Sequence, residues 1–420
     1  MAQLTNYSSS QDLSNGFREN WSPTLENFLG QYNVSAELCG KVAEGVLAAN
    51  GGDSYNYLTV AEGESGDINP YTEAAADDAT VTVDLMVLNL TSEYKFKQEE
   101  DEKGLSQTYE SFFGRQGEAA LKAHNKDIDG NFFAIAFQNA ENVFDEGDVI
   151  EGGSAGTPVT IAKANIDQVA YNSQALISES AQEGGALAFV GDTRVIGTLG
   201  VSGFANGASV SDRQYSRGLT AQLNNGHVGG FFGLEFYQSL FIPHAYKLTY
   251  TGQPADTETM VIGGITLTMV ATLTGGDGEV LIGADEDATY TNLVALLNNP
   301  SGSTATYKGF TINSASHKTL RKFAGKLDAT AGVATLISKA GRFTTAPTEA
   351  LGNATMGSTQ LKYIPVTLYG AIELAKPRGV RFNEGKNDFG TQMNYSSRVR
   401  YGVATPTNDK KRYAFIEATA

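Results

Sequence analysis

The clearest periodic pattern in this chain lies between residues 80 and 97. Apolar residues occupy one parity of its first half, at Val81, Val83, Leu85 and Val87. Polar Thr82 and Asp84 occupy the other parity, which is the period of a strand with one buried face. From Met86 onward apolar residues also fall on the second face, so the later half is either covered on both sides or shifted by a bulge.

Helical spacing follows this strand. Ser106 is a suitable N-cap for a helix whose apolar residues lie three and four positions apart and which should end near His124. Its glycines weaken it by about 1 kcal/mol each relative to alanine, so packing has to hold it. A second helix is predicted over residues 128–137, and a third within residues 161–181.

Short apolar runs predict further strands. The apolar run at 186–190 predicts a buried strand, and the phenylalanine-rich residues 228–242 predict one strand that ends at Pro243. Residues 363–369 and 413–416 are the clearest strands of the closing region. Strands and helices that mix in this way along the chain predict an α+β fold.

The composition and periodicity of the chain change at Tyr250. From there to about Arg342 come threonine-rich alternation, glycine turns, a strand at 265–273 and a helix near 290–297. We interpret this stretch as a compact α+β insert. Residues 343–358, rich in Thr, Ala and Gly, are predicted to be a linker.

Residues 54–84 form an early stretch that alternates Gly, Asp, Glu and Thr with isolated apolar residues. It holds too few apolar residues to build a core of its own, so it is predicted to project from the body. We expect it to become ordered only by lying on a neighbouring copy of the molecule.

These patterns predict a division of the chain into an arm, a loop, a core and an insert. Residues 1–50 are the N-terminal arm, and residues 51–94 are an extended loop with its return strand. Residues 95–249 and 343–420 together form the core, and residues 250–342 form the inserted domain. A chain of 420 residues exceeds the size at which one hydrophobic core stops growing, about 250–300 residues, so several packed units are expected.

The net charge of −17 disfavours a surface built to bind nucleic acid. The charge is also uneven: residues 1–110 hold 19 acidic and 5 basic side chains, whereas residues 371–420 hold 5 acidic and 9 basic ones. This asymmetry suits head-to-tail contacts between copies. A solvated acidic face explains it equally well.

Cysteine content and hydropathy bear on where the protein is made. The single cysteine, Cys39, cannot form an internal disulfide, and the N-terminus lacks the layout of a secretory signal. No apolar run approaches the ~18 residues of a membrane span. We therefore expect synthesis in a cytoplasm and no membrane partner.

A search for catalytic chemistry gives only isolated residues. The histidines His124, His227, His244 and His317 and the lone Cys39 have no metal-ligand spacing. Ser154 lies in a Gly-x-Ser-x-Gly string, but no strand precedes it and Thr157-Pro158 follows it, so a flexible loop is favoured over a nucleophile. A hydrolase that uses Ser154, Asp192 or Glu235 is the weakest hypothesis.

Two acidic clusters are candidate cation sites. Asp277 and the run Asp285-Glu286-Asp287 supply oxygen ligands, but they lack the spacing of a calcium loop. The run at 99–102 complements the positive end of the helix predicted after Ser106. The sequence thus predicts no enzyme, with no catalytic, cofactor-binding or metal-binding residues and no cofactor.

The order of elements resembles the major capsid proteins of tailed bacteriophages. Residues 80–133 are similar to the segment in which their long hairpin returns into a strand and then the spine helix. Residues 226–243, GHVGGFFGLEFYQSLFIP, resemble the later strand pair, and residues 368–406 resemble the final strands. Residues 261–298 are similar to modules found in several phage structural proteins.

This resemblance implies the Hong Kong 97-like fold, with an N-terminal arm, an extended hairpin loop, a peripheral domain with the spine helix, and an axial domain. It implies self-assembly as hexamers and pentamers into an icosahedral head that encloses double-stranded DNA, and so a location in the virion. The implied partners are further copies of the chain, a scaffolding protein, a portal, a decoration protein and DNA contacted without sequence preference. A tail-tube or decoration protein with a binding insert is the alternative.

Some members of that family cross-link a lysine of the projecting loop to an asparagine of a neighbour. This chain has no lysine between Lys41 and Lys95. Cross-linking through that loop is therefore not expected, and a separate scaffolding protein is predicted because no long charged helical region precedes the loop.

Overall fold

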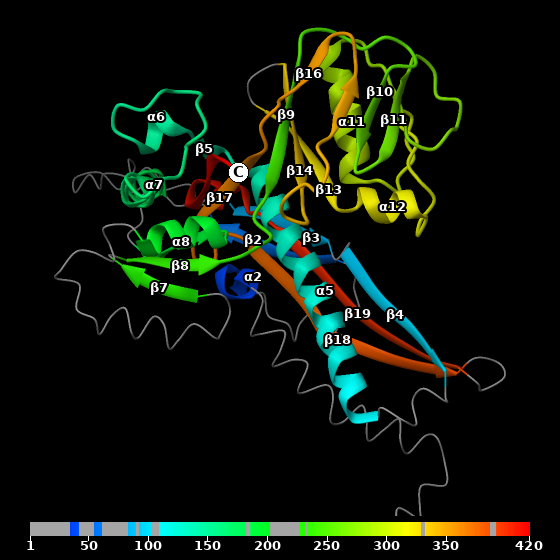
Figure 1. Cartoon of the computed structure of the whole chain (residues 1–420), viewed down its shortest axis with the longest axis horizontal. Coiled ribbons are helices and arrows are strands. Elements are labelled where there is room, and N and C mark those ends of the chain that lie inside the picture. Colours follow the sequence, from blue (N-terminus) through cyan, green and yellow to red (C-terminus); the bar gives the residue numbers. More distant parts are fainter. Residues whose placement is uncertain are drawn as a thin grey trace, which may run out of the picture.

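A mixed α+β fold is seen in the computed structural model of the chain (Figure 1), so the α+β part of the predicted fold class is confirmed. The structure describes the following residues: 34–41, 54–60, 83–89, 92–101, 109–181, 185–201, 227–231, 233–328, 332–386 and 392–420. The predicted arm over residues 1–50 therefore lies largely outside the described residues.

A ten-stranded sheet forms the body of the molecule. Its central strand β17 is buried along its whole length, with antiparallel β20 on one side and β6 and β9 sharing the other. The strands are β5 (Asn142–Phe144), β6 (Leu187–Gly191), β7 (His227–Phe231), β8 (Leu234–Gln238), β9 (His244–Tyr250), β13 (Phe323–Leu327), β14 (Val333–Ser338), β16 (Ala354–Met356), β17 (Leu361–Leu368) and β20 (Tyr413–Thr419).

Two helices pack against this sheet. Helix α7 (Ile166–Ala181) contacts β17 and β20, and helix α8 (Thr193–Val201) contacts β6 and β8. Both helices pack with the strands into one large apolar core. Three short helices also belong to this part of the described chain: α2 (Val34–Leu38), α6 (Glu146–Val149) and η2 (Thr407–Arg412).

A long ribbon leaves the body toward the lower right of Figure 1, with one long helix alongside it. The ribbon is a sheet in the order β1-β18-β19-β4, formed by β1 (Gly40–Lys41), β18 (Glu373–Lys386), β19 (Gln392–Ala404) and β4 (Ser92–Asp101). The helix α5 (Tyr109–Asn139) has 31 residues, about 46 Å at 1.5 Å per residue.

A second lobe, defined here as residues 244–357, lies at the upper right of Figure 1 and has its own apolar core. It contains a sheet in the order β12-β11-β10-β15 and two helices, and strands β9, β13, β14 and β16 join it to the body sheet. The further elements are β10 (Thr259–Ile262), β11 (Ile265–Val270), β12 (Glu279–Leu281), β15 (Thr348–Ala350), α11 (Glu286–Asn298) and α12 (Ala315–Leu320). The domain boundaries given above stay predictions.

Several predictions of local structure are wrong. The two helices predicted to either side of residues 125–127 are one continuous helix, α5. The strand predicted over residues 80–97 is two strands, β3 (Val83–Asn89) and β4, that belong to different sheets. The β2–β3 register runs from Val83 to Asn89 without a shift, so the predicted alternative of a bulge is wrong. Cover on both faces of β3 stays a prediction.

Two further predictions also differ from the structure. Residues 228–242 do not form one strand, because the chain turns at Gly233, whose φ of +82° suits glycine, and β7 and β8 pair as a hairpin. The predicted linker at 343–358 contains β15 and β16, which pair with β10 and β9. The strands predicted at 186–190, 265–273, 363–369 and 413–416 are confirmed.

The early projecting stretch is described only where it pairs. Strand β2 (Ser54–Val60) pairs with β3 in a two-stranded hairpin, and β3 contacts β19 of the same chain. The base of the hairpin thus lies against the chain's own ribbon. The expectation that it becomes ordered on a neighbouring copy remains a prediction for residues 61–82, which lie outside the described residues.

Candidate functional site: a charged junction

The polar contacts that matter most gather where α5 meets the second lobe. The ammonium of Lys326, on β13, donates to the carbonyl oxygens of Phe137 at 3.0 Å and of Ala140 at 2.9 Å, and lies 4.9 Å from the centre of the Phe137 ring. A helix leaves its last carbonyls without intrahelical partners, and a cation suits that negative end. Lys326 therefore caps α5, although burial lowers the pKa of its ammonium.

Amide side chains tie the same helix end to the second lobe. Gln138 donates from Nε2 to Asn298 Oδ1 at 2.7 Å and to the carbonyl of Gly325 at 3.1 Å. Asn298 in turn accepts from the backbone N–H of Gly325 at 2.9 Å and donates to its carbonyl at 3.1 Å. These bonds fix β13 and the end of α11 against α5.

One turn of α5 connects the lobe with the ribbon. The hydroxyl of Tyr401, on β19, lies 2.7 Å from Asp127 Oδ2 and accepts from the Asn131 amide. Arg321, which follows α12, forms a 3.8 Å ion pair with the same Asp127 oxygen. Burial lowers the pKa of Lys339, at the end of β14, to about 8, and the nearby Asp127 opposes that shift.

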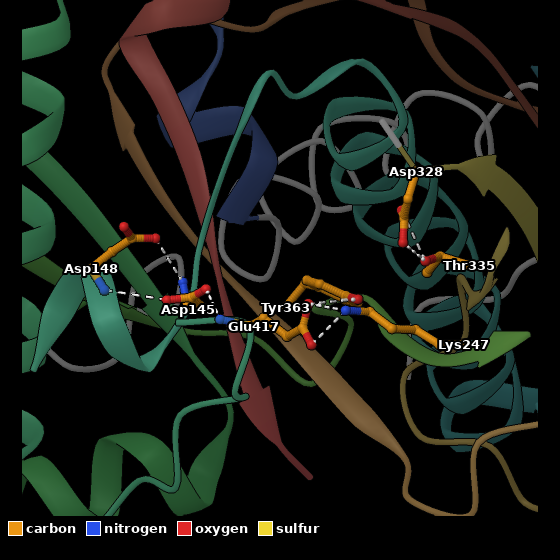
Figure 2. Close-up of polar contacts among 8 residues, drawn as sticks. Asp145, Asp148, Lys247, Asp328, Thr335, Tyr363 and Glu417 are labelled. Carbon is orange, nitrogen blue, oxygen red and sulfur yellow. Dashed lines mark hydrogen bonds and ion pairs between the residues drawn. The ribbon is translucent and has the colours of Figure 1, made fainter. Parts of the chain in front are cut away.

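A partly buried ion pair joins the second lobe to the body (Figure 2). Lys247, on β9, contacts both carboxylate oxygens of Glu417, on β20, at 2.7 Å, and the Tyr363 hydroxyl donates to Glu417 at 3.4 Å. Asp328 accepts from the Thr335 hydroxyl at 3.1 Å, and burial raises the pKa of its carboxyl group. Burial also raises the pKa of Tyr363 well above its usual value, so the phenol stays neutral.

The junction is built to hold parts of the chain together. Its cations have acceptors or carboxylate partners, and its carboxylates accept from side chains of the same chain, as charges in protein interiors require. No nucleophile is placed beside a base in it. The chemistry that it supports is rigid positioning of the lobe, the helix and the ribbon.

Ser154 lies in a loop and not on a nucleophile elbow. It is exposed between Gly152 and Gly156, both of which have a positive φ. The carboxylate of Asp145 holds the loop by accepting from the N–H groups of Gly147 at 2.8 Å and of Gly156 (Figure 2 shows its capping bonds).

Asp192 follows strand β6, and Glu235 lies on the neighbouring parallel strand β8. Asp192 accepts from the N–H of Val195 at 2.8 Å and so caps α8. It also pairs with Lys362 at 3.4 Å. Glu235 stands opposite Ala188 in the β6–β8 register. Among the described residues, no hydrogen bond joins Asp192 to Ser154.

The acids considered as calcium ligands bond to protein groups. Asp285 caps α11 by accepting from the Ala288 N–H at 2.7 Å, and Asp287 accepts from the Tyr250 hydroxyl at 2.7 Å. The structure, over the ranges that it describes, contains no group of three or more His, Cys, Asp or Glu residues able to hold a metal ion. Asp277 and Glu286 are not part of any such group.

The histidines are distributed over separate elements. His124 is in α5, His227 in β7, His244 in β9 and His317 in α12. Burial lowers the pKa of His124 to about 4 and also lowers the pKa values of His244 and His317. Cys39, half-buried, follows α2.

Sequence reasoning missed the junction residues. Lys326, Lys247 and Asp127 are ordinary charged residues in the sequence, and their partners lie more than 150 positions away. The one signal of a buried charge lies outside the junction: Lys362 interrupts an apolar run that folds as a fully buried strand. A lysine in such a run indicates a paired or functional charge.

No helix in the described part of the chain is long and apolar enough to cross a bilayer.

No family model matches the sequence, and no curated protein does. Among solved structures, the chain is similar to the acid-stable capsid structure of Helicobacter pylori bacteriophage KHP30, at 10% identity, 100% of both chains and a TM-score of 0.47. The capsid of Ralstonia phage GP4 matches at 7% identity over 93% of this chain and 91% of the other, with a TM-score of 0.46. Mycobacterium phage Che8 matches at 10% identity over 92% and 91%, with a TM-score of 0.44.

Two of these three structures, those of phages GP4 and KHP30, are described as capsids. Function has to be inferred from the chain's own geometry, because each of these TM-scores is below 0.5.

Proposed function

We propose that this chain is a major capsid subunit, with no catalytic role, that assembles as hexamers and pentamers into the icosahedral head of a tailed phage around double-stranded DNA. In this proposal the Hong Kong 97-like peripheral domain is α5 with the ribbon, and the extended loop is the β2–β3 hairpin. The axial domain is the body around α7, α8 and β6–β8, and the second lobe is the inserted domain. The virion is its location after synthesis in the host cytoplasm.

The observation that carries the proposal is the open edge of the ribbon. Strand β4 has ten residues, and β18 has fourteen, of which β1 pairs with only Glu373 and Leu374. Within the described residues, the rest of both outer edges has no partner strand. Long unpaired edges are a liability in a protein that stays monomeric, and another copy of the chain would cover them in a shell.

The hairpin supports the same proposal. A two-stranded hairpin is at best marginally stable in water, and β2–β3 pairs with no further strand among the described residues. The 22 residues that connect its strands, 61–82, include six acidic and no basic residues. We expect this acidic connection to lie on a neighbouring copy, with scaffolding, portal and decoration proteins as further partners.

Electron microscopy of the purified chain tests the proposal. The protein would be produced alone and together with a candidate scaffolding protein from the same genome, and imaged in negative stain. Closed polyhedral shells in either preparation support the proposal, and uniform tubes point to a tail-tube protein instead. A protein that stays a compact monomer at high concentration, with and without the scaffold, contradicts it.

A further inference from the structure

A cavity of about 590 Å³ opens at one end of the body sheet, away from the charged junction. It lies among the loop before α7, the first turns of α8, the start of β17 and the end of β20. Its lining residues are Ile161, Ala162, Lys163, Thr193, Arg194, Val195, Gly197, Thr198, Lys362, Thr419 and Ala420. Its volume lies in the range of small-ligand pockets, roughly 300–1,000 Å³.

Lys362 is the unusual residue of this cavity. It is 3% exposed, on a strand whose every residue is buried. An ammonium has three N–H donors, yet within the described residues its one partner is Asp192, at 3.4 Å. A buried charge is costly unless acceptors surround it, so a single long contact leaves Lys362 in need of further acceptors.

The carboxylate of Asp192 contacts two donors. One of its oxygens accepts from the Val195 N–H at 2.8 Å, and the other contacts Lys362. The imidazole of His244 lies close enough for the charges of Asp192, Lys362 and Arg342 to act on it. The carboxylate of Asp192 is thus shared and does not serve Lys362 alone.

Two exposed cations stand at the mouth of the same cavity. Lys163 precedes α7, and Arg194 lies in the first turn of α8, where the helix dipole is positive. Together with Lys362 at the base, they place three positive side chains around one hollow. Arginine binds oxyanions through paired N–H groups, and lysine binds them as a point charge.

We propose that this cavity binds a phosphate-class oxyanion, either free phosphate or a phosphate group of nucleic acid. Lys362 supplies the buried donor, and Lys163 and Arg194 close over the anion from the rim. The site goes beyond the shell function and does not depend on it, because all of its lining residues belong to the body of a single chain.

Isothermal titration of the full chain with inorganic phosphate, at constant ionic strength, tests the proposal. We expect one site with a dissociation constant of about 1 mM or tighter. The double variant Lys163→Ala with Arg194→Ala should bind at least about tenfold more weakly, because each charge-assisted contact contributes roughly that factor. Both residues are exposed, so the variant should keep the thermal stability of the parent.

A matched control removes the same charge elsewhere. Lys318 and Lys322 are exposed on the second lobe, and the variant Lys318→Ala with Lys322→Ala should bind phosphate like the parent. Absence of saturable phosphate binding by the parent overturns the proposal. Equal weakening in the rim variant and the control overturns it as well, since binding would then follow net charge alone.

A short DNA duplex distinguishes the two sources of the phosphate group. If duplex binding, followed by fluorescence anisotropy, weakens in the rim variant and is competed by inorganic phosphate, the group belongs to nucleic acid. If phosphate binds and the duplex does not, the ligand is free phosphate. Both outcomes support the site, and neither depends on whether the chain forms shells.

Discussion

Replacing Gly130 by alanine should destabilise the protein, against the usual rule for helices. In the interior of a helix this change normally stabilises by about 1 kcal/mol, because glycine carries the larger backbone entropy. At Gly130 a Cβ would lie 2.0 Å from the carbonyl oxygen of Lys339, at the end of β14. Real contacts of this kind need more than 3 Å, so α5 and β14 would have to separate by more than an ångström.

The magnitude follows from opposing effects. Overpacking of this kind costs about 1–3 kcal/mol or more, which outweighs the gain in helix propensity. We expect a net loss of about 2 kcal/mol. The second lobe should loosen with it, because Arg321 and Lys339 reach α5 beside the same turn.

Gly197 in α8 supplies the matched control. A Cβ there meets nothing within 4 Å, so Gly197→Ala should stabilise by about 1 kcal/mol. The two variants should therefore shift the thermal unfolding midpoint in opposite directions, as followed by circular dichroism. Hydrogen exchange should also rise in residues 315–339 for Gly130→Ala alone. A Gly130→Ala protein as stable as the parent would refute the close approach of α5 and β14.

Three further predictions concern buried charges. Lys326→Met removes the cap of α5 and should cost about 2 kcal/mol of local stability at that helix end. Amide exchange at residues 136–140 should therefore become roughly tenfold to a hundredfold faster, while exchange in α7 stays unchanged. Lys247→Met leaves Glu417 buried without its partner and should cost about 3 kcal/mol, while adding Glu417→Leu should recover much of that loss in a double-mutant cycle. His124 has its pKa lowered to about 4, so the folded state binds fewer protons than the unfolded one between pH 4 and 6.5, and stability should fall as the pH drops through that window. His124→Asn should flatten this fall by about 3 kcal/mol in urea midpoints measured against pH.

The sequence predicted the body strands because their patterns are continuous. The sequence of strand β17 is apolar apart from Lys362 and Thr367, and it folds as a fully buried strand. The sequence pattern did not resolve the β7–β8 hairpin, although Gly233 marks the turn between its two strands. To predict this hairpin one has to know which strands pair, and the whole fold decides that pairing.

The helix prediction failed for a different reason. Residues 125–131, NKDIDGN, are poor helix formers, so the pattern favours a break there. In the fold the side chains of Asp127, Asp129 and Asn131 bond to distant segments, and these tertiary contacts override propensity. The candidate junction was unpredictable on the same ground, because the contacts of Lys326, Lys247 and Asp127 join residues that the sequence keeps far apart.

The weak helix propensity of residues 125–131 falls where three parts of the molecule meet α5. Asp127 receives Tyr401 of the ribbon and Arg321 of the second lobe, and Asp129 accepts from the Ser35 N–H of α2 at 3.1 Å. Gly130 lets the second lobe approach the helix backbone. One helical turn therefore sets the directions of the ribbon, the lobe and α2 together, so a change at this turn shifts all three. In a shell of the proposed kind the ribbon and the lobe would meet different neighbours, and their fixed relative direction would determine how copies curve around one another.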